Sequence, residues 1–137
     1  MPPKTKSMEQ QVKDVITRFQ LEMSGHAPTK VTVTLDQATL IVTLIDALSP
    51  VEVTLSQTET GAAQVQEYHN RLFMCSLPAL REELQRVTGV AIQDAAVEFE
   101  TDNGVVTHTF VNGTVIQLFR LASGIPASKW TGEISSS

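Results

Sequence analysis

The spacing of apolar positions predicts an amphipathic helix over residues 7–24. Apolar side chains recur there at intervals of three and four, which places them on one stripe of a helix. Ser7 and Gln10 form a capping-box pattern at its start, and Gly25 suits the left-handed end of a helix. The stripe consists of Met8, Val12, Val15, Ile16, Phe19 and Met23.

Beyond residue 30 the pattern changes to the alternation that is typical of strands. Val31, Val33 and Leu35 alternate with threonines, which predicts a strand with one polar face. Residues 39–46 are apolar on both faces apart from Thr43, so we expect a central strand whose second face is covered by helix. Because the connection between them is short, the two strands should form a hairpin.

A helix start with three independent signals follows the hairpin. Ser49 can cap the helix, Pro50 suits the first helical position, where no N–H is needed, and Glu52 completes a capping box. These three residues are candidate structural or interaction residues, and we interpret them first as caps.

The helical spacing then continues to Thr88-Gly89, with a weak point over residues 58–61. Pro78 has no backbone N–H and crowds the preceding turn. We therefore expect a long, broken helical region that kinks or restarts near Ser76.

The last third of the chain returns to alternation and turn signals. Residues 97–100, 105–111 and 114–121 have strand character, and Asn-Gly pairs separate them at 103–104 and 112–113. This predicts a two- or three-strand antiparallel meander. The alternative is one long bent strand with a bulge at residues 112–113.

The element order predicts an α+β fold: an N-terminal helix, a β-hairpin, the broken helical region and the meander, with one mostly antiparallel sheet covered by helices. We expect a disordered tail over residues 1–6, a single domain over residues 7–121 and a flexible C-terminal tail over residues 122–137, which are rich in Ser, Gly and Pro. Trp130 falls in that tail, either as a docking aromatic or as part of the disorder.

Composition fits one soluble domain and excludes one class of partner. The chain has 137 residues, of which 42% are apolar and 18% charged, enough for a core without disulfides. Its net charge of −5 argues against nucleic-acid binding, which needs a clustered excess of Lys and Arg. Residues 31–119 hold three basic and eleven acidic side chains, so the predicted domain is more acidic than the total suggests.

The single cysteine and the apolar run lengths indicate the compartment. Cys75 cannot form an intramolecular disulfide, which favours a reducing, cytoplasmic location. The strongest apolar run, residues 40–45, is far too short for a transmembrane segment. We expect any attachment to the membrane to be peripheral, through a partner.

Four segments in this order resemble a bacterial protein family. They are residues 27–30 (Ala-Pro-Thr-Lys, with Pro28), residues 48–52 (Leu-Ser-Pro-Val-Glu) with Leu55, Arg71, and residues 87–90 (Val-Thr-Gly-Val). The chain is similar over residues 8–121 to component C of the Na⁺-translocating membrane-potential-generating system. It departs from the family pattern at Pro78 and in the length of the region around Asn112-Gly113.

This resemblance implies a small soluble protein associated with bicarbonate uptake and membrane-potential generation. The partners that it implies are the membrane-embedded and peripheral subunits of an ion or bicarbonate transport system. It implies no catalytic residues that could be transferred to this chain.

The sequence carries no pattern that predicts a catalytic, cofactor or metal site. His26, His69, Cys75 and His108 match no usual ligand spacing. We expect a loop position for His26, a helix surface for His69, burial for Cys75 and a strand face for His108. Buried in apolar surroundings, a thiol is a poor nucleophile. The glycines stand singly and form no phosphate-binding loop.

Arg71 is the polar residue that we single out, because it lies among apolar residues of the long helical region. If it points inward it needs a partner, with Glu52, Glu67 or a carboxylate of a strand as candidates; otherwise it lies exposed along the helix.

Two functions of different classes remain. The first is a non-enzymatic accessory or interaction domain with a protein partner, expected to be a homodimer. The alternative is a small-ligand sensor or enzyme with a pocket between sheet and helices, anchored by His108 and Arg71.

Overall fold

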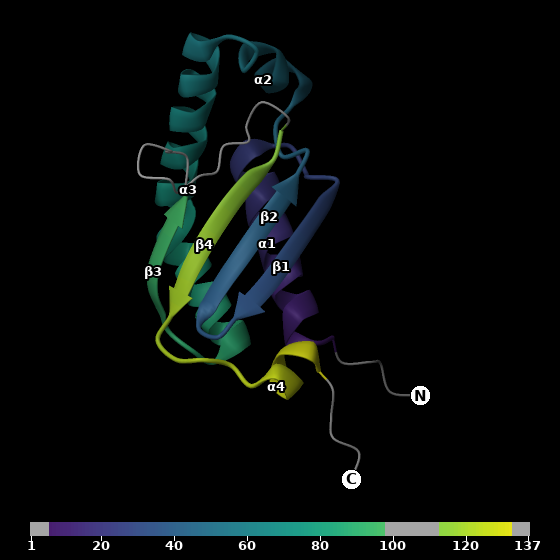
Figure 1. Cartoon of the computed structure of the whole chain (residues 1–137), viewed down its shortest axis with the longest axis vertical. Coiled ribbons are helices and arrows are strands. Elements are labelled where there is room, and N and C mark those ends of the chain that lie inside the picture. The colour runs from purple at the N-terminus through teal and green to yellow at the C-terminus, as the bar shows by residue number, and fades with distance from the viewer. Residues whose placement is uncertain (1–5, 98–112, 133–137) are drawn as a thin grey trace.

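The computed structural model describes residues 6–97 and 113–132, which form one sheet and four helices in that part of the chain. The order of elements is α1 (Met8–Ser24), β1 (Lys30–Asp36), β2 (Thr39–Ile45), α2 (Pro50–Leu55), α3 (Glu59–Thr88), β3 (Ile92–Val97), β4 (Val115–Leu121) and α4 (Ala127–Thr131). Figure 1 shows the sheet with the two long helices behind it. The predicted α+β fold is confirmed.

The sheet is antiparallel throughout, with the strand order β1-β2-β4-β3. The predicted hairpin is present: Lys30 lies opposite Ile45, and Asp36 opposite Thr39. β3 and β4, the last two strands of the described chain, pair antiparallel. β3 begins at Ile92, five residues before the strand predicted over residues 97–100, of which residues 98–100 lie outside the described residues. The strand predicted around residues 105–111 lies outside the described residues.

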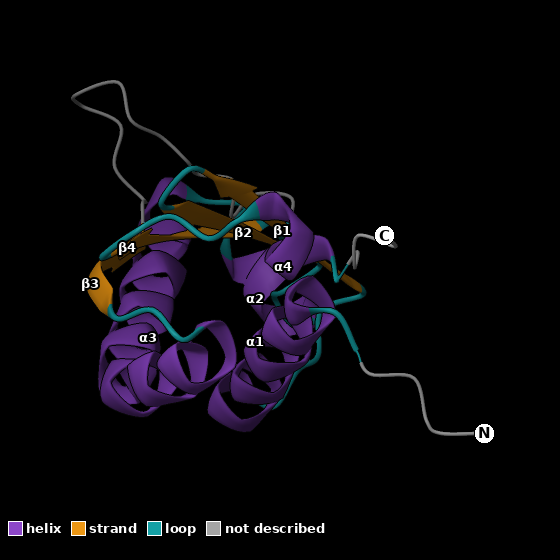
Figure 2. Cartoon of the chain, turned by 90° about the horizontal axis from the view of Figure 1, so that it is seen from below, coloured by secondary structure: helices purple, strands orange, loops and turns teal. Residues whose placement is uncertain are grey.

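Both long helices lie on the same face of the sheet, as the end-on view of Figure 2 shows. Along β2, buried residues alternate with partly exposed ones: Leu40, Val42 and Leu44 face the helices, while Ile41 and Thr43 do not. β2 is central, as predicted, but the expectation of helix on its second face is wrong for the described elements. Apolar residues on both faces of a strand do not by themselves specify two helical layers.

Pro78 does not interrupt α3, which runs continuously through all 30 of its residues. The restart expected near Ser76 is wrong, because the helix continues through Pro78. Pro78 is exposed, whereas Phe73, Leu77 and Leu80 are buried in the core. Burial of the opposite face holds the helix together although one backbone hydrogen bond is missing.

The chain remains folded beyond residue 121, which corrects the boundary expected from the sequence. Ile125 and Trp130 are buried, and the short helix α4 contacts α1. Gly132 lies so close to Ser7 that a Cβ atom there would approach the Ser7 Cβ to 2.9 Å. The C-terminal segment therefore packs on the start of α1, and Trp130 is a core residue.

Replacing Trp130 tests whether α4 is part of the cooperative fold. We expect Trp130→Ala to lower the free energy of unfolding by about 3 kcal/mol, because it removes a large buried side chain. Urea denaturation followed by circular dichroism measures the change. The exposed neighbour is the control: Lys129→Ala should change the value by less than about 0.5 kcal/mol. Equal small effects would contradict the packing of α4.

Replacing Pro78 tests the cost of the missing hydrogen bond. We expect Pro78→Ala to raise the free energy of unfolding by about 1–3 kcal/mol, because alanine supplies an N–H for the Met74 carbonyl. Chemical denaturation at fixed pH gives the difference. The exposed Gln85→Ala variant of the same helix serves as the control. If Pro78→Ala were instead less stable than the wild type, the proline ring would make contacts that alanine cannot replace.

Candidate functional site

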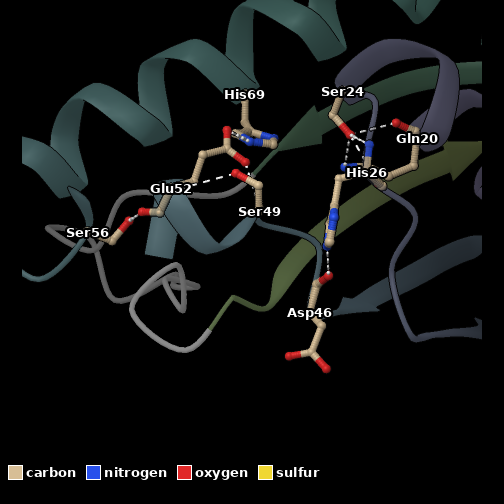
Figure 3. Close-up of polar contacts among 8 residues, drawn as sticks. All are labelled: Gln20, Ser24, His26, Asp46, Ser49, Glu52, Ser56 and His69. Atoms are coloured by element: carbon tan, nitrogen blue, oxygen red, sulfur yellow. Dashed lines mark hydrogen bonds and ion pairs between the residues drawn. The ribbon is translucent and has the colours of Figure 1, made fainter. Parts of the chain in front are cut away.

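Polar side chains gather where α1 ends, β2 ends and α2 begins (Figure 3). We call this group the polar cluster. Its hydrogen bonds form two groups, of which one connects the end of α1 with Asp46 and the other connects α2 with His69 of α3. We look for chemistry here because these groups contain His, Ser, Asp and Glu side chains. The cluster consists of Gln20, Ser24, His26, Asp46, Ser49, Glu52, Ser56 and His69.

The capping box predicted at the start of α2 is present. The Ser49 Oγ accepts a hydrogen bond from the Glu52 N–H at 3.3 Å, and the Glu52 Oε1 accepts one from the Ser49 N–H at 2.9 Å. Pro50 occupies the first turn of the helix. All three residues thus serve the local structure, as their spacing indicated.

The same Glu52 carboxylate also holds α3. Its Oε2 accepts a hydrogen bond from the His69 Nε2 at 2.8 Å, and the two side chains are 17% and 3% exposed. One carboxylate therefore caps α2 with one oxygen and ties it to the long helix with the other. Burial alone would raise the pKa of the Glu52 carboxyl, but the hydrogen bonds from Ser49 and His69 outweigh burial and lower this pKa below its usual value.

His69 lies on the buried face of α3 and not on the helix surface, which corrects the expectation from the sequence. Val65, His69 and Phe73 follow one another at intervals of four on the buried face. This spacing was the available signal, because a residue at those intervals shares the apolar stripe. Tyr68, next in sequence, is turned outward and 51% exposed.

A glycine makes the approach of α2 to α3 possible. A Cβ atom on Gly61 would lie 1.9 Å from the Leu55 carbonyl oxygen at the end of α2. The Thr58 Oγ caps α3 by accepting a hydrogen bond from the Gly61 N–H. The weak point predicted over residues 58–61 is thus the break between two helices.

His26 lies in a loop, as expected, and fastens α1 to the hairpin. Its Nε2 is 3.0 Å from the Asp46 carbonyl oxygen, and the Thr29 hydroxyl donates to the Asp46 carboxylate at 2.8 Å. Ser24, at the end of α1, accepts a hydrogen bond from the His26 N–H. Pro28 lies within this connection and is partly buried.

Arg71 is exposed on α3 and pairs with Glu67 at 2.7 Å, with side chains 75% and 59% exposed. Of the two arrangements considered for Arg71, the structure has the exposed one. Glu52, another of the candidate partners, binds His69 instead. His108 lies outside the described residues, so its predicted role beside Arg71 stays a prediction.

Cys75 is exposed, and the expectation that its thiol is buried is wrong. It lies in an open hollow of about 330 Å³ between α1 and α3, two residues along the helix from the buried Phe73. Neighbouring residues of a helix face different directions, so an apolar local sequence does not fix the burial of one thiol. The hollow is lined by Phe19, Glu22, Met23, Leu72, Cys75 and Ser76.

The polar cluster contains the residue types of a nucleophilic triad but not its arrangement. In a triad the hydroxyl bonds to the imidazole, whereas the Ser49 Oγ here accepts from a backbone N–H of its own helix. His69 is also almost fully buried. Within residues 6–97 and 113–132, no three His, Cys, Asp or Glu side chains come together as metal ligands. The hydrogen bonds of this cluster hold helices and loops in place.

Fold and cluster together define a small α+β domain whose inward polar groups serve its own architecture. The family comparison gives the identification: a model described as Na⁺-translocating membrane potential-generating system (MpsC) matches residues 4–113. The chain belongs to this family, and the resemblance seen in the sequence is confirmed. The match ends before β4 and α4.

Two other comparisons give no relative. Neither a curated protein nor a solved structure matches the chain. Of the helices in the described ranges, none combines the length and the apolar character that crossing a membrane requires.

Removing the Glu52 carboxylate tests its double role. We expect Glu52→Ala to lower the free energy of unfolding by about 2–3 kcal/mol, since a cap and the hydrogen bond to a buried imidazole are lost together. Urea denaturation measures the loss. Glu67→Ala is the matched control, because it breaks an exposed pair and should cost less than about 0.5 kcal/mol.

The lowered pKa of Glu52 adds a pH dependence. A carboxyl whose pKa is lower in the folded state than in the unfolded state contributes stability at neutral pH, and this contribution is lost as the pH falls through the folded-state value. From about pH 6 to about pH 3, the wild type should therefore lose more stability than Glu52→Gln, which has no carboxyl at this position. Parallel losses in the two proteins would contradict the lowered pKa.

Proposed function

We propose that this protein is a non-enzymatic accessory subunit of a Na⁺-translocating membrane-potential-generating system and that it acts through protein–protein contacts. Membership in the family is the observation that carries the proposal. In this proposal the protein lies in the cytoplasm and docks peripherally on the membrane-embedded subunits, in a system linked to bicarbonate uptake.

The chemistry of the polar cluster supports a role other than catalysis. Glu52, His69 and Ser49 are engaged with one another or with the helix ends, and His69 has almost no exposed surface. A catalytic group must reach its substrate, whereas these groups hold α2 against α3. The cluster thus favours a fixed interaction surface over an active site.

α2 presents the most exposed large apolar side chain of the described residues. Val51 is 68% exposed and Leu55, one turn further on, is 48% exposed. Exposed apolar side chains that share one helix face are typical of protein contact sites. Because the capping box and the Glu52–His69 pair hold α2 in place, this face would be presented without ordering a loop.

The charge of the chain favours a protein partner over direct lipid contact. Its net charge is −5, and anionic lipid headgroups attract clusters of Lys and Arg. Anionic headgroups repel a negatively charged chain, and docking on a membrane subunit through α2 avoids this repulsion.

A quantitative pull-down tests the proposal. The tagged protein should capture ion- or bicarbonate-transport subunits from detergent-solubilised native membranes, and V51D/L55D should reduce the captured amount at least tenfold, because charges would be desolvated at the contact. Mass spectrometry with labelled standards gives the amounts. T54D/Q57D, which adds the same two negative charges at exposed polar positions in α2 and just after it, is the charge-matched control.

Two results would refute this function. One is capture of no membrane transport subunit by the wild type. The other is unchanged growth and bicarbonate uptake at low CO₂ when the gene is deleted.

The ligand-binding alternative rests on the hollow between α1 and α3. Its volume, about 330 Å³, is at the lower end of small-molecule sites, and Glu22 and Ser76 are the polar side chains in it. It lies between helices and not between sheet and helices. A thermal-shift screen with nucleotides, metal ions and bicarbonate separates the two functions, because a ligand that binds the folded state raises the melting midpoint.

A further inference from the structure

β1 forms one edge of the sheet and is paired on one side. All seven of its residues lie in regular register with β2, and no described strand lies along its other side (Figure 1). Edge strands are usually protected by proline, by a bulge or by central charges. β1 has none of these, because residues 31–35 are uncharged, contain no proline and pair with β2 without a shift.

The sequence of β1, Lys-Val-Thr-Val-Thr-Leu-Asp, is complementary to itself in the antiparallel direction. A two-fold axis through Val33 would place Lys30 opposite Asp36 of a second copy, and Thr32 opposite Thr34 of that copy. Val31 would lie opposite Leu35. Each interface would thus hold two ion pairs at its ends and matched residues between them.

The burial pattern agrees with this register. Val33 is buried under the helices and Val31 and Leu35 are partly buried, while Thr32 and Thr34 are exposed. In the register centred on Val33, odd-numbered residues meet odd-numbered residues, so the helix-covered faces of the two sheets join and outward-pointing backbone groups meet their counterparts.

Other registers lose this match. A shift by one residue sets threonines opposite valines and brings opposite faces together. A shift by two leaves both Lys30 and Asp36 without an oppositely charged partner. Charge and face together select the arrangement centred on Val33.

We propose that two copies of this chain pair antiparallel through β1 about an axis at Val33, which gives one eight-stranded sheet. The interface is isologous, as a two-fold dimer requires. α1 contacts β1, so the two copies of α1 would flank the joined strands on the same face. This inference concerns self-association and does not depend on the membrane system.

Charge reversal tests the dimer. The wild type should sediment at twice the 14.9 kDa of one chain. K30D and D36K should each raise the dimer Kd about tenfold at low salt, because they set like charges opposite each other at both ends of the interface. The double variant K30D/D36K should restore the wild-type Kd. K129D, at an exposed position of α4, is the control for the change in net charge that K30D makes.

Disulfide trapping tests the register. In a C75S background, a mixture of T32C and T34C chains should form a mixed disulfide much faster than either chain forms a disulfide with itself. Directly opposed positions have Cβ atoms within reach of a disulfide, whereas positions two residues apart do not. Both side chains are exposed, and circular dichroism verifies the fold of each variant.

Three outcomes would overturn the proposal. The first is that the protein stays monomeric at all concentrations up to about 1 mM, because the dimer Kd would then exceed this concentration and be too weak for specific pairing. The second is a dimer whose Kd is unaffected by K30D and that forms no mixed disulfide, because it would use another surface. The third is a monomer whose β1 edge is protected from hydrogen exchange by a captured partner, since the occupant would then be that partner's strand.

Discussion

One face of the sheet is buried under α1 and α3, and the other elements take their positions from this packing. Phe73 of α3 lies against Phe119 of β4, with ring centroids 5.9 Å apart. At the surface, Glu83 of α3 bonds to Arg86 and to Arg18 of α1, and these guanidinium groups lower the pKa of its carboxyl to about 2. α4 then rests on α1, and α2 on α3. Burial of one face supplies the free energy, while the polar contacts fix the positions of the helix ends.

The features that the sequence predicted well are those with local causes. A cap is defined by residues three positions apart, so the helix starts at Ser7 and Ser49 were predicted at the right residues. The hairpin follows from alternation and a short connection, and β1 and β2 pair antiparallel as a hairpin requires. In each case, neighbouring residues decide the outcome.

The errors have a common cause, which is that tertiary packing overrides local preference. Pro78 remains in a helix because the opposite face is buried. Trp130 is ordered because α1 offers a surface to cover, which the Ser- and Gly-rich segment around it did not reveal. For His69 the signal was present in its spacing from Val65 and Phe73. The hydrogen bond between His69 and Glu52 spans 17 residues and had no local signature. The family was predicted from the order of several motifs, each of which by itself is only a cap, a turn or a helix end.

The strand order has a consequence for how the chain is made. β4 lies between β2 and β3, yet it is synthesised after both of them. Until β4 has been synthesised, the edges of β2 and β3 that will pair with it are unpaired, whereas in the finished sheet both of these edges are paired. The sheet closes only after β4 has been synthesised, so folding of this domain is completed by a strand that must enter at the centre.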